Sequence, residues 1–399
     1  MSTGSAMVES GFRPLVELLS EESRPGVTSG NNIEIFTKGT DKLEALLKDI
    51  SEAKEYIHFQ YYLFGKDVSS LAVREALINK AKEGVKVRIL HENIANYDTK
   101  RSFYNEMRKY GVELIRIFKP GLNPLKFILN LNRRNHRKIV VIDGRIGYTG
   151  GMNIKDRYFT HWRDTHIRLT GPAVASLQKI FLDGWKSVHG KLDKPQEYYF
   201  PDDCHPKNEV FKVDVLRDKL VQITPDGPDS KAPVLQQSYV WAIKNAKKYF
   251  WLQTPYFIPP KDILQELKDA AARGVDVRVM IPKEPETFFL GYAIQSYFKE
   301  CLEAGIHIYE RGGGFIHSKV FIADDYLSSI GSANLDNRSF NINYEVNTYF
   351  YDKETALRNI EIFNEDLKLS EEVHLSDWVS VPMFQRLLQR FFRLFAAQL

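Results

Sequence analysis

The sequence is poor in cysteine and contains no long uninterrupted apolar run. Only Cys204 and Cys301 occur in 399 residues; they are too few for a disulfide framework and fit a reducing compartment, although they could still pair with each other. No window approaches the roughly 18 consecutive apolar residues of a membrane-spanning helix, and no signal-peptide pattern opens the chain. As written, the sequence does not predict an integral membrane protein.

A strong excess of either charge is also missing. The net charge of +4 is mildly basic, which suits an anionic lipid surface or a phosphorylated substrate and does not require nucleic acid. Neither an H-E-x-x-H pattern nor a Cys/His cluster is present, so we expect neither a metal ion nor another cofactor. The length suits roughly two or three domains, and the hydrophobic fraction of 43% is that of a globular protein.

One pattern, H-x-K-x-x-x-x-D, occurs twice. The two copies comprise His136, Lys138 and Asp143, and His317, Lys319 and Asp324. Apolar residues fill each spacer, so each copy predicts a buried strand that ends at a turn containing the aspartate. Residues two apart on a strand share a face, so the histidine and lysine of each copy should point the same way.

The match between the two copies continues downstream. Asn153 and Asn334 each follow the motif histidine by 17 residues, and Asp164 and Glu345 each follow it by 28 residues. Each asparagine closes a short glycine-containing segment, and the second segment includes Ser332. Five polar or charged types therefore hold register over 29 residues in both copies. This predicts one site built from two half-sites.

The rest of the chain alternates predicted helices and strands, in the same order twice. In the first half we predict helices over 41–53, 69–83 and 100–109 and strands over 56–63, 85–90 and 112–118. In the second half we predict helices over 232–246, 263–273 and 290–304 and strands over 249–255, 275–281 and 306–309. The similarity of 81–88 to 271–278 supports a tandem duplication. We expect an α/β fold of two duplicated domains, each a mixed β-sheet flanked by helices, related by a pseudo-two-fold axis and sharing one active site.

The duplication suggests domain boundaries. We predict a leader over 1–30 with a short helix and a turn at 29–32, a first domain over 31–192, a linker over 193–210, a second domain over 211–372 and a C-terminal amphipathic helix over 373–399. The residues before Met7 read as an added start, which suggests that a native segment has been removed.

Two stretches suggest contact with lipid. Within 119–134 the first copy holds about thirteen extra residues, apolar with a basic end. They either cap the sheet or serve as a lid or lipid contact, and we favour a lid or lipid contact. From 383 to 398 a helical wheel separates apolar residues from three arginines, which predicts a cationic amphipathic helix. That helix either docks on the protein body or binds a membrane surface.

The paired residues suit phosphoryl chemistry. Lys138, Lys319, Asn153 and Asn334 supply positive charge and amide donors for a phosphate, and the glycine-containing turn with Ser332 can add backbone N–H groups. One histidine can then attack phosphorus while the other protonates the leaving oxygen. Asp164 and Glu345 fit the carboxylates that orient the imidazoles through their other nitrogens. No step requires a metal.

These motifs resemble the phospholipase D superfamily, whose signature is H-x-K-x-x-x-x-D followed by G-G/S-x-N. The resemblance runs from about residue 31 to 373, and within the superfamily it is strongest to the bacterial cardiolipin synthases. The segments that carry it are 135–139 (NHRKI), 149–154 (TGGMNI), 162–165 (WRDT), 253–257 (QTPYF), 315–319 (FIHSK) and 331–340 (GSANLDNRSF).

The resemblance implies transfer of a phosphatidyl group from one phosphatidylglycerol to another through a phosphatidyl-histidine, giving cardiolipin and glycerol. By analogy we favour His136 as nucleophile and His317 as acid. Asp143 and Asp324 belong to the family's catalytic motif, although their turn position suggests a structural role. The resemblance also implies the cytoplasmic face of the bacterial inner membrane. Many relatives carry two N-terminal spanning helices that this chain lacks, so either such a segment has been removed or the protein binds membranes peripherally.

Two other functions remain open at this point. A hydrolase of the same superfamily, either a phospholipase or a nuclease, would use the same residues, and an inactive lipid-binding scaffold would retain the fold. A nuclease should show a broad basic groove with stacking aromatic residues, whereas here basic and apolar residues coincide in 119–134 and in the tail. The aromatic residues Tyr61, Tyr62, Tyr256 and Phe257 are more often core than substrate wall. The sequence does not indicate an oligomeric state.

Overall fold

The computed structural model describes residues 4–22, 26–92, 94–117, 132–207, 209, 211–379 and 381–395. The leader forms α1 (Arg13–Ser20). The first half contains β1 (Thr28–Phe36), α2 (Gly39–Glu52), β2 (Tyr56–Tyr61), α3 (Val68–Lys82), β3 (Lys86–Glu92), α4 (Arg101–Lys109), β4 (Glu113–Ile117), β5 (Ile139–Ile142), β6 (Ile146–Gly150), α6 (Asp156–Thr160), β7 (His166–Thr170) and α7 (Val174–Ser187).

The second half repeats this order. It contains β8 (Val215–Asp226), α8 (Val234–Asn245), β9 (Tyr249–Gln253), β10 (Phe257–Ile258), α9 (Lys261–Ala272), β11 (Asp276–Pro282), α10 (Phe288–Gln295), α11 (Phe298–Glu303), β12 (His307–Arg311), β13 (Val320–Ala323), β14 (Leu327–Gly331), β15 (Leu335–Asp336), α12 (Asn337–Asn341), β16 (Glu345–Tyr351) and α13 (Lys353–Leu367). Strand β17 (Ser370–Val373) and helices α14 (Leu375–Val379) and α15 (Met383–Arg393) follow.

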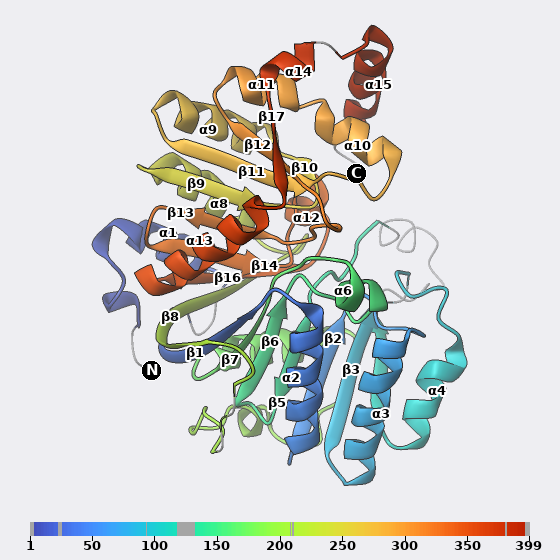
Figure 1. Ribbon diagram of the computed structural model, residues 1–399. Helices are drawn as coiled ribbons and strands as arrows, with labels where there is room; N and C mark the ends of the chain where they lie inside the picture. Colours follow the sequence, from blue (N-terminus) through green and yellow to red (C-terminus); the bar gives the residue numbers. More distant parts are fainter. Residues whose placement is uncertain are drawn as a thin grey trace.

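A single mixed sheet of 15 strands runs through both halves, in the order β17-β12-β11-β9-β13-β14-β16-β8-β1-β7-β6-β5-β2-β3-β4. Strands β1 and β8 pair antiparallel at its centre, with blue β1 beside olive β8 in Figure 1. Outward from this pair, β7, β6, β5, β2, β3 and β4 match β16, β14, β13, β9, β11 and β12. The predicted α/β fold of two duplicated, pseudo-symmetric halves is confirmed.

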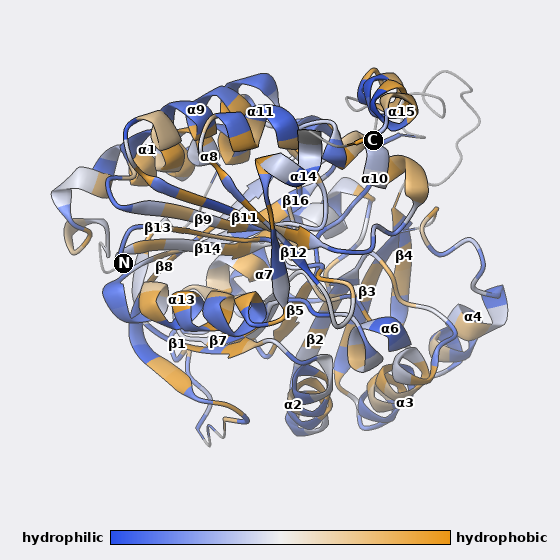
Figure 2. Cartoon of the chain, turned by 45° about the horizontal axis from the view of Figure 1, so that its top comes forward, coloured by the Kyte–Doolittle hydropathy of each residue, from blue (hydrophilic) through white to orange (hydrophobic). Residues whose placement is uncertain are grey.

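Helices cover both faces of the sheet and enclose a core that the halves share. One buried cluster joins Leu177 of α7 and Phe363 of α13 to Ile139 of β5 and Val320 of β13. On the other face, α2 packs with α3 and α8 packs with α9. Figure 2 shows the sheet lying between helices of mixed hydropathy. Because one core includes strands of both halves, burial of apolar surface holds the halves together.

Two local predictions were wrong. The expected turn at 29–32 is part of β1, where Gly30 has a φ of +76° and the register with β8 shifts between Thr28 and Ile33. Pairing across the halves therefore overrides the local turn signal. The single helix expected over 290–304 is two helices, α10 and α11. The leader helix α1 packs against α8 of the second half.

The C-terminal helix docks with its apolar side mostly outward. Phe392 stacks on Tyr292 of α10, with ring centroids 6.0 Å apart, while Phe384 is 71% exposed. The other exposed apolar residues of this segment are Met383, Leu387, Phe391, Leu394 and Phe395. Within the described ranges, no helix is long and apolar enough to cross a membrane. The predicted insertion over 119–134 lies mostly outside the described residues, which resume at 132.

Candidate active site

Each H-x-K motif lies at the junction of the halves, immediately before β5 or β13. The backbone N–H of His136 donates to the carbonyl of Tyr344 at 2.9 Å, and that of His317 donates to the carbonyl of Arg163 at 2.6 Å. Both bonds cross from one half to the other, and a short parallel β-bridge accompanies each. The backbone of one half therefore fixes the position of the other half's histidine.

The carboxylates that contact the two imidazoles are exchanged between the halves. Nδ1 of His136 lies 2.9 Å and 3.0 Å from the two carboxylate oxygens of Glu345. Nδ1 of His317 lies 2.7 Å from Oδ2 of Asp164. Equal spacing within each half of the sequence leaves this pairing open, whereas the structure shows that neither half supplies both members of a pair.

Burial governs the ionisation of these groups. It lowers the pKa of His136 to about 4, although Glu345 opposes the shift. It also lowers the pKa of His317 well below 6.5, and the nearby Lys319 adds to this effect. Burial raises the pKa of Asp164 to about 6. Each imidazole is therefore neutral at pH 7, with the proton on Nδ1 donated to its carboxylate and the lone pair on Nε2.

The two lysines reach the histidines of their own motifs. Nζ of Lys138 donates to the carbonyl of His136 at 2.6 Å, and Nζ of Lys319 donates to the carbonyl of His317. Nζ of Lys319 also lies 2.7 Å from Nδ1 and 3.2 Å from Nε2 of His317. Burial lowers the pKa of Lys319 to about 8 and that of Lys138 well below 10.5. A bound anion would raise the pKa of both lysines and so favour their charged forms.

The asparagines of the two half-sites are bonded differently. Oδ1 of Asn153 accepts from the N–H of Leu63 at 3.1 Å, and its Nδ2 donates to the hydroxyl of Tyr158 at 2.8 Å. Oδ1 of Asn334 is buried and has no hydrogen-bond partner among the described residues. Asn334 also lines the central cavity described below. The second half-site thus retains an unpaired amide oxygen, which can accept a hydrogen bond from a hydroxyl group in the cavity.

Ser332 acts on Glu345 rather than facing the cavity. Its hydroxyl donates to Oε2 of Glu345 at 2.5 Å and accepts from the N–H of Val346 at 2.9 Å. The matching position in the first half is Gly151, where a Cβ would collide with the carboxylate of Asp164. Ser332 therefore holds the carboxylate of Glu345 through a hydrogen bond, whereas Gly151 leaves room for the carboxylate of Asp164.

The motif aspartates lie at the far ends of their strands. Asp143 is separated from His136 by seven residues of mostly extended chain, roughly 20 Å. Its carboxylate accepts from the N–H groups of Lys54, Glu55 and Tyr56 at 2.8–2.9 Å. Asp143 and Gly144 have φ values of +50° and +66° and lie in the three-residue turn between Ile142 of β5 and Ile146 of β6.

Asp324 has the corresponding role in the second half. It accepts from the N–H groups of Lys247, Lys248 and Tyr249 at 2.8–3.2 Å. The resemblance grouped Asp143 and Asp324 with the catalytic residues, but neither carboxylate lies beside a motif histidine. Both anchor turns, in line with their positions in the sequence.

One cavity of about 390 Å³ brings the two half-sites together. Both histidines and both asparagines line it. The other lining residues are Tyr62, Leu63, Ala95, Arg134, Arg157, Tyr158, Trp162, Tyr256, Glu286, Asp336, Arg338 and Asn343. Tyr62 and Tyr256 thus line the cavity and were wrongly expected in the core, whereas Tyr61 and Phe257 are buried as expected.

Two arginines of this wall were not predicted from the sequence. Arg157 and Arg338 differ by 181 positions, the offset that also relates His136 to His317, so the repeat itself held the signal. Their surroundings differ: Arg157 lies 4.0 Å from the Trp162 ring centroid, and Arg338 donates to Oδ1 of Asn132 at 2.6 Å. Arg157 therefore stacks on an aromatic ring of its own half, whereas Arg338 bonds to a residue of the first half.

The described side chains of the site do not form a set of metal ligands. The part of the chain that the structure describes holds no group of three or more His, Cys, Asp or Glu residues placed to bind a metal ion. The imidazole Nδ1 atoms already bond to carboxylates, so this donor set is arranged for proton transfer and for binding an anion.

Comparison with known proteins agrees with this geometry. The family described as cardiolipin synthase, PLD-like domain, matches residues 46–185 and 239–367. The major cardiolipin synthase ClsA of Bacillus subtilis is 39% identical over 390 residues, covering 96% of this chain and 78% of that protein. A cardiolipin synthase of Geobacillus sp. is 38% identical, covering 96% and 75%.

A solved structure shares the fold. The phosphatidylserine synthase of Haemophilus influenzae superimposes with a TM-score of 0.68 at 15% identity, covering 92% of this chain and 95% of that one. At this identity the likeness concerns the fold alone, and the family follows from the sequence matches. Those matches show that the chain belongs to the cardiolipin synthase family of phospholipase D-like enzymes, which are phosphatidyltransferases.

Proposed function

We propose that the protein transfers the phosphatidyl group of one phosphatidylglycerol to the primary hydroxyl of a second, forming cardiolipin and releasing glycerol. The observation that carries this proposal is that two imidazoles, each with its own carboxylate, line one cavity. One such group can attack the phosphorus of a phosphodiester while the other protonates the leaving oxygen. The names of the relatives support the choice of lipid.

In the first step, Nε2 of His136 attacks phosphorus and forms an N–P bond. The bond from phosphorus to the glycerol oxygen breaks, and that oxygen takes a proton from Nε2 of His317. Lys138 and Lys319 offset the negative charge on the phosphoryl oxygens. The anionic substrate itself raises the pKa of His317, so that its imidazole can carry the proton it donates.

In the second step, His317 acts as a base. It takes the proton from the primary hydroxyl of the second phosphatidylglycerol, whose oxygen attacks phosphorus while the N–P bond to His136 breaks. Cardiolipin leaves and both histidines return to their starting states. Atoms, charge and protons balance without a co-reactant.

The surroundings of the two rings support the choice of nucleophile. Nε2 of His317 already has Lys319 at 3.2 Å. Nε2 of His136 has no polar contact within the described ranges, and the Tyr62 ring packs edge-on at 4.8 Å. A lone pair without a cationic donor is the better nucleophile. This favours His136 as the attacking group.

We further propose that the protein works at the cytoplasmic face of the bacterial inner membrane. Helix α15 presents exposed Met383, Phe384 and Leu394 on one side, which suits insertion into the interfacial region of a bilayer. Asn132, the first residue described after the gap at 118–131, accepts from Arg338 of the cavity wall.

The test is product analysis with phosphatidylglycerol in mixed micelles. The wild-type protein should release cardiolipin and glycerol, and His136→Ala and His317→Ala should abolish this, whereas His374→Ala, at an exposed site, should not. Phosphatidic acid as the sole lipid product would identify a hydrolase instead. Full turnover in both active-site variants would refute the mechanism.

A further inference from the structure

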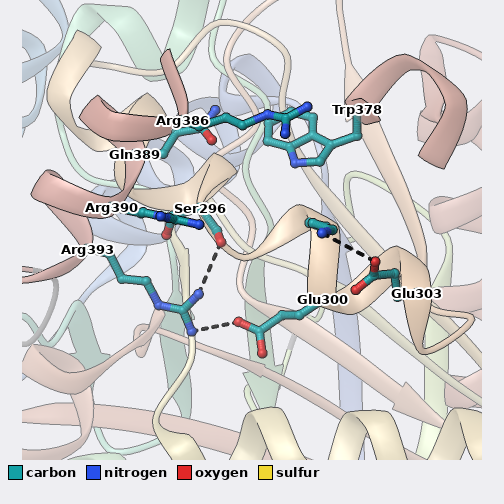
Figure 3. Close-up of a pocket in the computed structure, with 9 residues that line it drawn as sticks. Ser296, Glu300, Glu303, Trp378, Arg386, Gln389, Arg390 and Arg393 are labelled. Carbon is teal, nitrogen blue, oxygen red and sulfur yellow. Dashed lines mark hydrogen bonds and ion pairs between the residues drawn. The ribbon is translucent and has the colours of Figure 1, made fainter. Parts of the chain in front are cut away.

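A second basic pocket lies away from the twin histidines, where α15 meets α11 and α14. It has a volume of about 330 Å³. Its lining residues are Ser296, Lys299, Glu300, Glu303, Trp378, Arg386, Gln389, Arg390 and Arg393 (Figure 3). It shares none of these residues with the active-site cavity.

The acidic groups of this pocket are already paired. Glu300 lies 2.6 Å from Arg393 and 3.4 Å from Lys268, and Lys299 lies 3.6 Å from Glu303. Arg393 also donates to the carbonyl of Ser296 at 3.1 Å, which ties α15 to the turn before α11 (Figure 3). These contacts hold the helix in place.

Two further arginines face this pocket. Arg386 lies beside the indole of Trp378 in Figure 3. Arg390 has no acidic partner within the described ranges, and both side chains are exposed. They are four positions apart, so they share one flank of α15. This flank places two positive charges at the pocket.

Buried Gln389 adds a neutral donor to this site. Its residue is 5% exposed, yet its Nε2 has no hydrogen-bond partner among the described residues. Buried amide groups are almost always paired, because an unmet N–H loses its bonds to water. An anionic oxygen in the pocket would accept from this group and from the two arginines together.

The orientation of α15 indicates where the ligand comes from. On a helical wheel, the exposed Met383, Leu387 and Leu394 fall on one stripe, and Arg386 and Arg390 lie along its edge. If the apolar stripe enters a bilayer, arginines at its edge lie at the level of the lipid headgroups. The pocket then opens toward phosphates of the same membrane surface.

We propose that this pocket binds the phosphodiester headgroup of an anionic glycerophospholipid, separately from the catalytic cavity. Arg386 and Arg390 pair with the phosphate, and Gln389 donates to one of its oxygens. The lipid thereby anchors the docked α15 to the membrane. The inference rests on the proposed function only for the location at a membrane, not for the chemistry.

The test measures binding of the full chain to vesicles of phosphatidylcholine with or without phosphatidylserine, an anionic phosphodiester that is not the proposed substrate. Arg386→Gln/Arg390→Gln should weaken binding to the anionic vesicles about tenfold or more. Gln389→Met, which changes no charge, should weaken it about threefold. Arg358→Gln/Lys368→Gln, with the same charge loss at exposed sites on and just after α13, should change it less than twofold.

Two further measurements distinguish lipid binding in this pocket from catalysis and from binding of a soluble phosphate. Turnover of phosphatidylglycerol in detergent micelles should stay within twofold of wild type in all variants, so a failure of the chemistry shows up independently of vesicle binding. Unchanged vesicle binding by Gln389→Met and by the double arginine variant would overturn the proposal. Full displacement from vesicles by glycerol 3-phosphate at constant ionic strength would overturn it too, and would reassign the pocket to a soluble phosphate.

Discussion

Glu345 of the second half holds the imidazole of His136 of the first half, with Nδ1 2.9 Å from Oε1. The reciprocal pair joins His317 to Asp164 at 2.7 Å. Each carboxylate sets the tautomer of a ring from the other half, so each half controls the reactivity of its partner.

Removing the charge of Glu345 should impair catalysis with little effect on folding. In Glu345→Gln the amide fills the same space but no longer stabilises an imidazolium, so kcat should fall on the order of 10²- to 10⁴-fold. The kcat of Asp164→Asn should fall by a similar factor. Steady-state kinetics on phosphatidylglycerol micelles, with thermal unfolding as the check on folding, measures this. Loss of less than threefold in both variants would contradict the assigned roles.

The alanine variants of the two histidines should differ in whether they form the phosphatidyl-enzyme intermediate. His136→Ala should form no phosphatidyl-enzyme. His317→Ala should retain slow formation of it from a donor whose leaving group needs no protonation, such as a p-nitrophenyl ester, because the missing acid is then unnecessary. Mass spectrometry of rapidly quenched protein would detect the adduct. An adduct on His317 in the His136→Ala protein would reverse the assignment.

The turn aspartates should matter for stability rather than turnover. Asp143→Asn keeps a residue that tolerates positive φ but weakens bonds to three backbone N–H groups. The free energy of unfolding should drop about 1–3 kcal/mol, while kcat per folded molecule changes less than threefold. Urea denaturation and kinetics on the same sample test both. Asp324→Asn, at the matching turn, serves as the parallel case; a large loss of kcat at full stability would return these residues to catalysis.

Buried Lys42 should destabilise the fold at neutral and acidic pH. Burial lowers its pKa to about 7, and its Nζ has no hydrogen-bond partner in the described part of the chain. Because the unfolded chain keeps this proton up to about 10.5, stability rises with pH between these values. Lys42→Met should therefore stabilise the protein, on the order of 3 kcal/mol below pH 7 and progressively less toward pH 10.

The pH dependence is the decisive part of that measurement. Urea denaturation of wild type and Lys42→Met at pH 6 and pH 9 gives the difference directly, and Lys54→Met, at an exposed position, should show no such trend. A gain in stability that is equal at both pH values would mean that packing rather than charge explains it.

The repeat could be predicted from the sequence because the same residue types recur at the same spacings in both halves. The 181-residue offset joins His136 to His317 and Asn153 to Asn334, and the fold follows from the alternation of helix and strand patterns around them. Relations between the halves could not be predicted in this way. The exchange of Asp164 and Glu345 and the strand through Gly30 both depend on contacts more than a hundred residues away.

The C-terminal helix α15 is a second case in which contacts between distant parts of the chain could not be predicted from the sequence. A helical wheel over 383–398 predicts an amphipathic helix, and α15 spans Met383–Arg393, but the wheel does not say which side meets the protein. In the structure Phe392 and Gln389 face the body, and most of the apolar side is exposed. Tyr62 and Tyr256 illustrate the point at the site: aromatic residues near a strand end look alike in sequence whether they fill a core or line a cavity.

The central pairing of β1 with β8, together with the exchanged carboxylates, bears on how such a chain could have arisen. A gene for only one half would encode a histidine without its carboxylate and a sheet with an open edge. Two copies of that product joined edge to edge would repair both defects at once. The ancestor of this chain would accordingly have worked as a homodimer, and fusion of the two genes would later have allowed the two half-sites to diverge.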